Sequence, residues 1–382
     1  MQKKIPMRHL LPAICLVISA VNAAWVIEDI PTAIQYTRGP NLIAKEMASA
    51  YRPVYDASGS KTGEHLAIAY RSRYLYVVLR QGAGWNSIPF DDNGRYPSIA
   101  LDSSGKPHMS YFRTSNDKLY YARTVPAGTG NCGPNATWAC EEVLSSIFGA
   151  PIGRNAITVH GAKVHILVET ASGSATYPSM VSRLTKTIGA ANWDAGADPV
   201  TFAKDLTDLD IKTDGSGSPQ VLINSEYLDW YRKTSSNWAG IGPFIGSGSF
   251  DMTGTGAPRV CYRDLGANRL IYARSNGTDY WTESVIDYDI GSKGSCSIAV
   301  PDSTGGVRVA GYYNPRIAYY DDVSESVKYA TPPMLASQPW SVQTVTTATG
   351  TRTIDLHLDK KARASIIYFD SAILKLRLAQ WQ

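Results

Sequence analysis

The chain has few phenylalanines, few histidines and little net charge. Its 382 residues include 7 Phe and 6 His, and the formal charge of +4 counts Lys3, Lys4 and Arg8 near the N-terminus. Nucleic-acid binding needs a basic surface that neutralises phosphates, so this composition argues against DNA or RNA as the main partner. The sequence also lacks GxSxG and HExxH motifs, and nucleophilic hydrolysis therefore has no support from sequence motifs.

Long hydrophobic runs are missing after residue 23. An apolar stretch at residues 10–21 follows a basic start and precedes small residues at 21–23. It is too short to span a bilayer, and the pattern is typical of a secretory signal peptide at residues 1–23, cleaved near Ala23. We therefore expect a secreted or periplasmic bacterial protein with no integral membrane span after cleavage.

Cysteine is sparse and shows no CxxC pair, which disfavours a zinc site. Four cysteines remain outside the signal peptide, namely Cys132, Cys140, Cys261 and Cys296. Export permits disulfides, and a local bridge between Cys132 and Cys140 is the favoured pairing. Cys261 and Cys296 are then left to pair between repeats, although four cysteines allow three connectivities.

What the chain has in plenty is tyrosine and tryptophan, 23 and 9 residues, and a repeated phrase. PSIALDSSGKPHMSYF at 97–112 has a second, looser copy, CSIAVPDSTGGVRVAGYY, at 296–313. Each copy contains an apolar strand, an Asp/Gly turn and a second strand, and a Tyr-rich third strand and a Trp-led fourth strand follow. Short strands bounded by Gly, Pro, Asp, Asn and Ser are typical of all-β proteins.

Seven copies of this unit cover the chain. The second strands of the copies begin at His65, His108, His165, Gln220, Arg259, Arg308 and Arg363. Four strands in every forty to fifty-five residues is the period of a β-propeller blade. The sequence predicts one propeller domain at 24–382, with blades at about 45–90, 94–145, 154–200, 205–245, 248–288, 294–346 and 351–382. The sixth blade is the least regular, because RIAYYDDVSESVKYA adds strand-like sequence between its second and third strands.

The two ends of the chain predict how the ring closes. The seventh copy stops after its third strand, at LAQWQ, while WVIEDI at 25–30 resembles the fourth strands of other copies. We therefore expect residues 24–31 to form the outer strand of the last blade, near Leu376. This pairing removes two exposed sheet edges.

The phrase SIALDSSGKPHMSYF followed by LYYAR resembles the repeat of exported bacterial β-propellers in the sialidase-like and lectin-like group. The resemblance covers essentially the whole chain after the signal and implies the fold more strongly than an activity. The turns at Asp102 and Asp302 lack the Trp and the spacing of a sialidase Asp-box. A sialidase assignment is therefore a statement about fold only.

Three histidines, His65, His108 and His165, occupy the same position in successive blades. They are weak candidates for a metal site or for acid–base chemistry. The alternative is that this repeat position prefers a polar residue beside the turn, since Gln220 and Arg259 stand there in other blades. We expect no cofactor.

Arginine, tyrosine and acidic residues recur where second strands end, and these loops of a propeller gather on one face. The candidate ligand-binding residues are Tyr70, Arg71, Tyr111, Arg113, Glu226, Tyr262, Arg263, Asp264 and Asp370. Arginine provides a planar fork for anions, so these residues favour a carboxylate or sulfate on a glycan. The alternative is ordinary ion pairing within the rim.

The favoured function is a binding module for a carbohydrate or anionic glycan, or another cell-surface component, acting as a monomer. A second hypothesis is a polysaccharide lyase or other glycan-cleaving enzyme, in which Arg113 would act with Tyr111 or His108. A third is a protein-interaction scaffold of the cell envelope.

Overall fold

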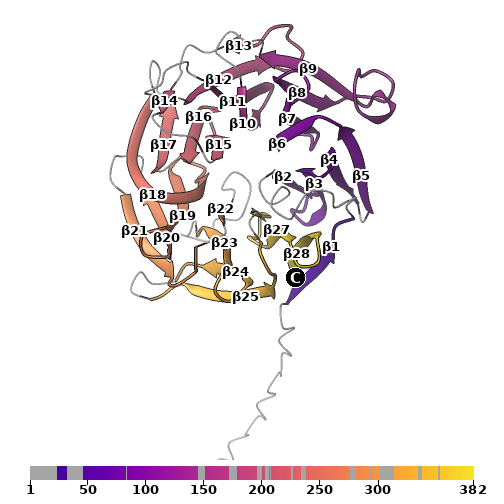
Figure 1. Cartoon of the computed structure of the whole chain (residues 1–382). Coiled ribbons are helices and arrows are strands. Elements are labelled where there is room, and N and C mark those ends of the chain that lie inside the picture. The colour runs from indigo at the N-terminus through magenta and orange to yellow at the C-terminus, as the bar shows by residue number, and fades with distance from the viewer. Residues whose placement is uncertain are drawn as a thin grey trace, which may run out of the picture.

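A computed structural model shows a ring of antiparallel sheets (Figure 1). It describes residues 24–31, 46–82, 84–144, 151–171, 179–195, 200–202, 206, 208–224, 227–233, 238–275, 281–292, 295–301, 314–333, 338–351 and 353–382. The predicted signal peptide and Glu226 lie outside this part. Within it, no helix is long and apolar enough to cross a membrane.

The first three blades each place their earliest strand at the inner edge. Blade 1 contains β2 (Met47–Tyr55), β3 (Lys61–Arg71), β4 (Leu75–Gln81) and β5 (Gly84–Asp91). Blade 2 contains β6 (Gly94–Leu101), β7 (Pro107–Arg113), β8 (Lys118–Thr124) and β9 (Trp138–Leu144), with the 3-10 helix η2 (Pro134–Ala136) before β9. Blade 3 contains β10 (Pro151–His160), β11 (Lys163–Ala171) and β12 (Ser179–Thr187), and both β13 (Asp194–Ala195) and β14 (Val200–Phe202) pair with β12.

Blades 4 and 5 share one long strand. Blade 4 contains β15 (Asp208–Thr213), β16 (Pro219–Asn224) and β17 (Tyr227–Lys233), and blade 5 contains β19 (Pro258–Asp264), β20 (Arg269–Ser275) and β21 (Trp281–Asp287). Between them, β18 (Trp238–Met252) pairs with β17 up to residue 245 and with β19 from residue 246. The chain therefore passes from the outer edge of one blade to the inner edge of the next without leaving the strand.

The last two blades include the closure. Blade 6 contains β22 (Cys296–Ala299), β23 (Arg316–Asp321), β24 (Ser326–Thr331) and β25 (Ser341–Thr347). Blade 7 contains β26 (Ile354–Leu358), β27 (Ala364–Asp370) and β28 (Lys375–Trp381), and β1 (Trp25–Asp29) is its outer strand. Register pairs Trp25 with Trp381 and Asp29 with Arg377, and the Ile30 amide donates to the Leu376 carbonyl at 2.9 Å. The predicted closure is confirmed.

Sequence analysis misplaced one strand. We predicted that the second strand of blade 6 begins at Arg308, within residues that the structure leaves undescribed. The strand that pairs with β22 is β23, at Arg316–Asp321. The segment RIAYYD, which we took as additional, is therefore the second strand itself. Its hydrophobic residues Ile317 and Tyr319 are buried between blades 5 and 6, which explains why it occupies this place.

Seven hydrophobic clusters hold the ring together, and each lies between two neighbouring blades. The inner strands contact one another in a complete circuit, in the order β2, β6, β10, β15, β18, β22, β26 and back to β2. This seven-bladed propeller is the fold that the repeat predicted. It brings side chains from seven distant parts of the sequence to one axis.

The Asp/Gly turns between first and second strands form as the sequence predicted. In blade 2, Asp102 Oδ1 accepts the amides of Ser104 and Lys106 at 2.8 and 2.9 Å, and Gly105 lies at φ 81°. Asp214 and Gly217 repeat this arrangement in blade 4. A carboxylate that bonds the following backbone, with glycine at positive φ, fixes such turns.

Both disulfides pair as favoured. Cys132–Cys140 closes the loop before β9, and Cys261–Cys296 joins β19 of blade 5 to β22 of blade 6. Disulfides are typical of proteins that fold in an oxidising compartment.

Candidate functional site

The inner strands alternate between hydrophobic and charged side chains. On β15, Leu209 and Ile211 are buried against blade 3, while Asp208 is exposed and Asp210 and Lys212 are half-buried. A strand directs successive side chains to opposite faces, so the charged set shares one face. The same alternation occurs on β26, where Asp355 and His357 separate the buried Ile354 and Leu356.

These charged residues meet around the axis, and we call them the axial cluster. Its members are Ser49, Asp208, Asp210, Lys212, Asp251, Asp355 and His357. Lys212 of blade 4 interacts electrostatically with Asp210, with Asp251 of blade 5 and with Asp355 of blade 7, and these carboxylates raise its pKa. Among the described residues none of them forms an ion pair with Lys212 within 4.0 Å. Two of the carboxylates do accept backbone amides, Asp251 from Val300 at 2.7 Å and Asp208 from Leu209 at 2.9 Å. The cluster thus combines an ammonium without a described ion-pair partner and carboxylates that have few donors.

A short hydrogen-bond chain joins blades 1 and 7 inside the cluster. Ser49 Oγ donates to Asp355 Oδ2 at 2.8 Å and lies 2.8 Å from His357 Nε2. Because the serine has one proton, His357 Nε2 is then the donor of the second bond. The Tyr51 ring stacks on the imidazole, with centroids 5.6 Å apart. The stack and the bond to Ser49 fix the orientation of His357.

Enclosure by the ring shifts the protonation of the cluster. Desolvation raises the pKa of both Asp208 and Asp355 to about 6, although Ser49 partly counters it at Asp355. Desolvation, followed by the charge of Lys212, lowers the pKa of His357 to about 3. At neutral pH the imidazole is therefore uncharged, and two carboxyl groups titrate just below neutrality. Shifted carboxyl groups of this kind concentrate at functional sites.

The predicted acidic candidates at the rim form turns. Asp264 Oδ1 accepts the amides of Gly266 and Ala267, and its Oδ2 receives Arg269 at 2.6 Å. Asp370 likewise accepts the Ala372 amide and lies 3.6 Å from Arg377. Asp321 of blade 6, which we did not single out, has the same arrangement with Lys328 at 2.6 Å. The rim thus has a repeated ion pair, in which an aspartate at the end of the second strand contacts a lysine or arginine of the third strand.

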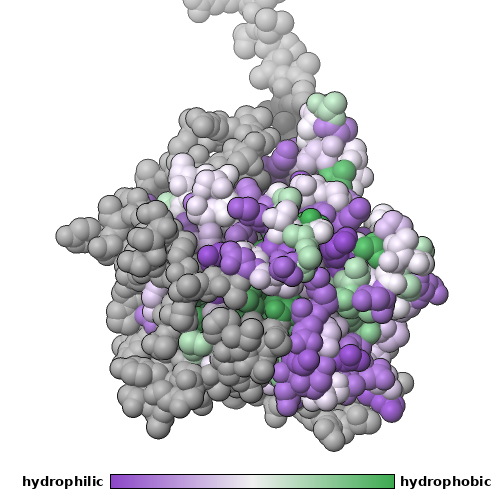
Figure 2. All heavy atoms as spheres, turned by 90° about the horizontal axis from the view of Figure 1, so that it is seen from above, coloured by the Kyte–Doolittle hydropathy of each residue, from purple (hydrophilic) through white to green (hydrophobic). Residues whose placement is uncertain are grey.

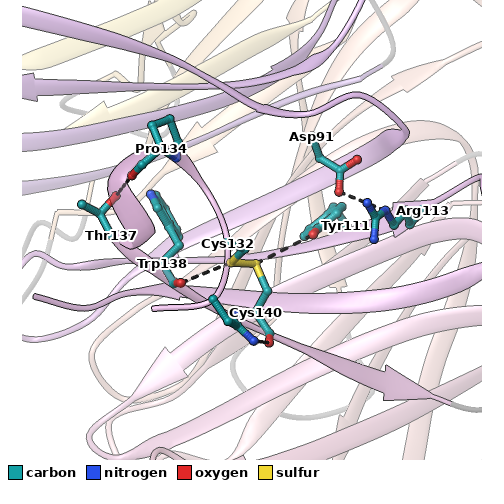
Figure 3. The surroundings of a disulfide bond; sticks show 9 residues. Asp91, Tyr111, Arg113, Cys132, Pro134, Thr137, Trp138 and Cys140 are labelled. Carbon is teal, nitrogen blue, oxygen red and sulfur yellow. Dashed lines mark hydrogen bonds and ion pairs between the residues drawn. A yellow bond between two sulfur atoms is a disulfide. The ribbon is translucent and has the colours of Figure 1, made fainter. Parts of the chain in front are cut away.

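The predicted tyrosines lie in the core. Tyr70 is fully buried and stacks on Tyr76, and Tyr262 is buried and donates to Glu283 at 2.9 Å. Tyr111 is also buried, and its hydroxyl points to the disulfide and lies 3.9 Å from Cys140 Sγ (Figure 3). Desolvation raises the pKa of Tyr111 and of Tyr262 above the ordinary value. A buried tyrosine with a raised pKa is a poor base for proton abstraction.

The predicted arginines have separate partners. Arg113 Nε lies 3.3 Å from Asp91 Oδ2, as Figure 3 shows. Arg71 donates to the Gly94 carbonyl, and the buried Arg263 donates to the Gly291 carbonyl. Arg71 and Arg263 thus hold the start of the following blade or the loop before it, whereas Arg113 of blade 2 binds the last residue of β5 in blade 1. The structure does not bring these three together.

The three candidate histidines also serve separate blades. His108 is buried, with Nδ1 2.5 Å from the Tyr121 hydroxyl and Nε2 3.5 Å from Asp102. The His65 ring lies against Gly105 of the next blade, where an added Cβ would meet it at 2.3 Å. Burial lowers the pKa of His165 to about 4. Among the described residues no group of three His, Cys, Asp or Glu is placed to hold a metal ion.

The residues of the axial cluster are not among those that the sequence singled out. A signal was present in LDIKT at 209–213 and IDLHL at 354–358, where charged residues alternate with aliphatic ones on first strands. Such alternation on the innermost strand of a ring places the charges toward the axis. The strand order around the axis was needed to show that they meet.

Comparisons with known proteins leave the activity open. No family model and no curated protein sequence matches this chain. Similar solved structures include AofleA from Arthrobotrys oligospora, with 10% identity, 85% of this chain and 91% of that chain covered and a TM-score of 0.46. The α-L-arabinofuranosidase Arb93A from Fusarium graminearum has 13% identity, 94% and 96% coverage and a TM-score of 0.47. The Trypanosoma rangeli sialidase has 11% identity, with 87% of this chain and 57% of that chain covered and a TM-score of 0.41. At these values the likeness concerns the propeller fold alone.

Proposed function

We propose that this protein binds a neutral glycan at the axial cluster. The observation that carries the proposal is that charged and hydroxyl side chains of blades 1, 4, 5 and 7 share one water-accessible axis, whereas the described rim candidates are engaged within the protein. Sugar hydroxyls donate and accept hydrogen bonds, so a mixture of carboxylates, an ammonium and a serine suits them.

The charge of the cluster favours a neutral ligand over an anionic one. Asp208, Asp210, Asp251 and Asp355 stand against the single ammonium of Lys212. An added carboxylate or sulfate would meet like charges in a partly desolvated place, which is unfavourable. A polysaccharide lyase is disfavoured for the same reason, because it must neutralise a uronate carboxylate. The proposal thus narrows our initial expectation, which included anionic glycans.

Cleavage of a neutral glycan is the second candidate. Glycoside hydrolysis uses one protonated and one ionised carboxyl group. Asp208 and Asp355 have a pKa of about 6 and interact electrostatically, so near pH 6 one can be protonated while the other is ionised. New reducing ends from a neutral hexasaccharide at pH 6, abolished by Asp355→Asn, would establish this activity. Binding without cleavage in the same sample would leave the first candidate.

The cellular setting is also a proposal. The two disulfides and the basic, apolar and small-residue pattern of residues 1–23 support export. Figure 2 shows hydrophobic residues scattered in small groups among hydrophilic ones on the described part of one side of the ring. Scattered groups of this kind are normal for a protein surface.

Calorimetric titration tests the binding proposal. The probes are neutral hexasaccharides of glucose, xylose and arabinose, with a hexamer of galacturonic acid as the anionic comparison. We expect at least one neutral probe to bind and Asp210→Asn to weaken its affinity by about tenfold or more. Arg113→Ala at the rim is the matched control and should leave the affinity unchanged.

Two results would overturn the proposal. One is the absence of binding by all neutral probes at millimolar concentration. The other is loss of binding in Arg113→Ala with none in Asp210→Asn, which would return the site to the rim.

A further inference from the structure

Tyr96 has an unusual backbone for its place in the fold. Nine non-glycine residues of the described part have positive φ, and these are Tyr96, Asp117, Asn135, Ala136, Asn268, Asp289, Glu325, Ala362 and Leu374. Eight of them lie in turns, loops or the short helix η2, where this conformation reverses the chain. Tyr96, at φ 49°, lies within β6, the inner strand of blade 2.

The conformation is unfavourable for this residue in two ways. A side chain at positive φ brings Cβ close to the backbone carbonyl, which glycine alone avoids. The next residue is Pro97, and proline further restricts the residue before it. Strain of this kind persists only where surrounding contacts enforce it, and it concentrates at ligand sites.

Contacts from three blades enforce it here. The register between β6 and β7 shifts between Arg95 and Ser98, so Tyr96 lies in a bulge. The carboxylate of Glu46, which is buried, accepts the Tyr96 amide at 3.2 Å and also binds Arg95 at 2.5 Å. From blade 3, Asn155 donates to the Tyr96 carbonyl at 2.7 Å. Both backbone polar groups of Tyr96 are therefore fixed by neighbouring blades.

The Tyr96 side chain has a contact within its own strand and stays accessible. The Arg95 guanidinium lies 5.0 Å from the Tyr96 ring centroid, and the ring is half-buried. Bulges re-aim a side chain that a regular strand would place elsewhere. The result is a rigid aromatic side chain that exposes part of its surface.

Tyr96 is linked to the axial cluster through blade 3. Asn155, which holds its carbonyl, follows Arg154, and Arg154 interacts electrostatically with Asp208 of the cluster. Tyr96 and Asp208 both lie near the beginning of inner strands, and these strands run in the same direction along the axis because the blades share one antiparallel strand order. Tyr96 therefore lies at the same end of the inner strands as the exposed Asp208.

We propose that Tyr96 is the aromatic platform on which a pyranose ring of the glycan stacks at this entrance to the axial cluster. The inference rests on the proposed function and deepens it by assigning a contact that selects for sugar rings. Tyrosine provides a large contact surface, and its rigidity reduces the ordering that binding requires. The bulge, the buried Glu46 and the strain have one common outcome, which is the fixed position of this ring.

The test separates binding from stability in Tyr96→Gly. Glycine accepts positive φ, so the variant keeps the backbone while removing the ring. We expect the neutral hexasaccharide that binds the wild type to lose about tenfold or more in affinity, which is the usual range for a central aromatic contact. Tyr96→Phe retains the ring and should bind within about threefold of the wild type.

Asp117→Gly is the matched control. Asp117 is exposed, has φ 53° and lies in a turn of the same blade. Its glycine variant relieves the same backbone strain and should leave affinity unchanged, and the melting temperatures of the two glycine variants should agree within a few degrees. A purely structural Tyr96 would give the opposite result, a lower melting temperature in Tyr96→Gly with wild-type affinity. Wild-type protein that binds no neutral probe would overturn the proposed function, and this inference with it.

Discussion

Asp321 at the rim and Asp355 at the axis lie on neighbouring blades. The two aspartates differ in their hydrogen-bond partners and in the direction of their pKa shifts. Asp321 receives Lys328 at 2.6 Å together with the Ser324 hydroxyl and two backbone amides. Burial alone would raise its pKa, but these bonds outweigh burial and lower it. Asp355 receives one serine hydroxyl, and desolvation raises its pKa to about 6.

The charges at the rim stabilise the fold, whereas the charges at the axis are placed to contact a ligand. At the rim, Asp264, Asp321 and Asp370 each have a lysine or arginine partner and accept backbone amides of a turn. The charge of each carboxylate therefore contributes to stability. At the axis the charges lie near one another without ion pairs among the described residues, which reduces stability in exchange for groups that can meet a ligand.

Asp321→Ala should lower the free energy of unfolding by about 2–3 kcal/mol at pH 7. The substitution removes the ion pair with the half-buried ammonium of Lys328 and the two bonds to backbone amides of the turn. A group with a lowered folded-state pKa stabilises above its unfolded value near 4, and this contribution disappears as pH falls through the folded value. Urea denaturation at pH 7 and pH 3 should therefore show a difference from the wild type that shrinks with acid.

Asp321→Asn is the control for this first test. Its amide oxygen can still accept the turn amides, so it should lose less stability than the alanine variant. An alanine variant as stable as the wild type at pH 7 would remove the distinction between rim and axis.

The fold could be predicted from the sequence because the sequence consists of repeats. Copies of strand, Asp/Gly turn and strand gave the seven blades, and the resemblance of residues 25–30 to fourth strands gave the closure. Local chemistry determines both, through turn residues and alternating hydrophobic positions. The exception was blade 6, where two candidate segments had strand-like sequence. Burial between blades selects β23 as the second strand, and no sequence motif predicts that burial.

The site was less accessible because it depends on contacts between blades. Arg113 and Asp264 stand at repeat positions suited to a ligand. Arg113 instead pairs with Asp91 at the end of blade 1, and Asp264 pairs with Arg269 on the adjoining strand β20. Conversely, Asp355 and Ser49 are 306 residues apart and meet only because the ring closes. Neither fact follows from residue type, and both follow from the order of the inner strands around the axis.

Asp355→Asn should have the opposite sign to the rim substitution. The folded-state pKa of about 6 exceeds the unfolded value, so ionisation above pH 6 destabilises the native state. The neutral amide removes this penalty, and the free energy of unfolding should rise by about 1 kcal/mol at pH 7.5, a value reduced from the full shift because water reaches the group. Denaturation at pH 4.5 should show little gain, since the wild-type carboxyl is then protonated in the folded protein.

A loss of stability in Asp355→Asn at pH 7.5 would contradict this account of the axis. It would mean that Lys212 and Ser49 already compensate the carboxylate as fully as Lys328 and Ser324 compensate Asp321.

Ser49→Ala should give the smallest effect on stability. It measures how much the Ser49 hydroxyl offsets the cost of ionising Asp355 at the axis. The Ser49 hydroxyl is the side-chain donor to Asp355, and it favours the ionised carboxylate. Its removal should raise the pKa of Asp355 further and lower the free energy of unfolding by about 0.5–1 kcal/mol at pH 7.5, with a smaller effect at pH 4.5, where the carboxyl is protonated. Combined with Asp355→Asn, the serine substitution should lose most of its effect, because partners in one hydrogen bond are not additive. An equal loss at both pH values, unchanged in the double variant, would instead assign the Ser49 hydroxyl to His357 and leave the carboxylate with the backbone bond from Ser49 alone.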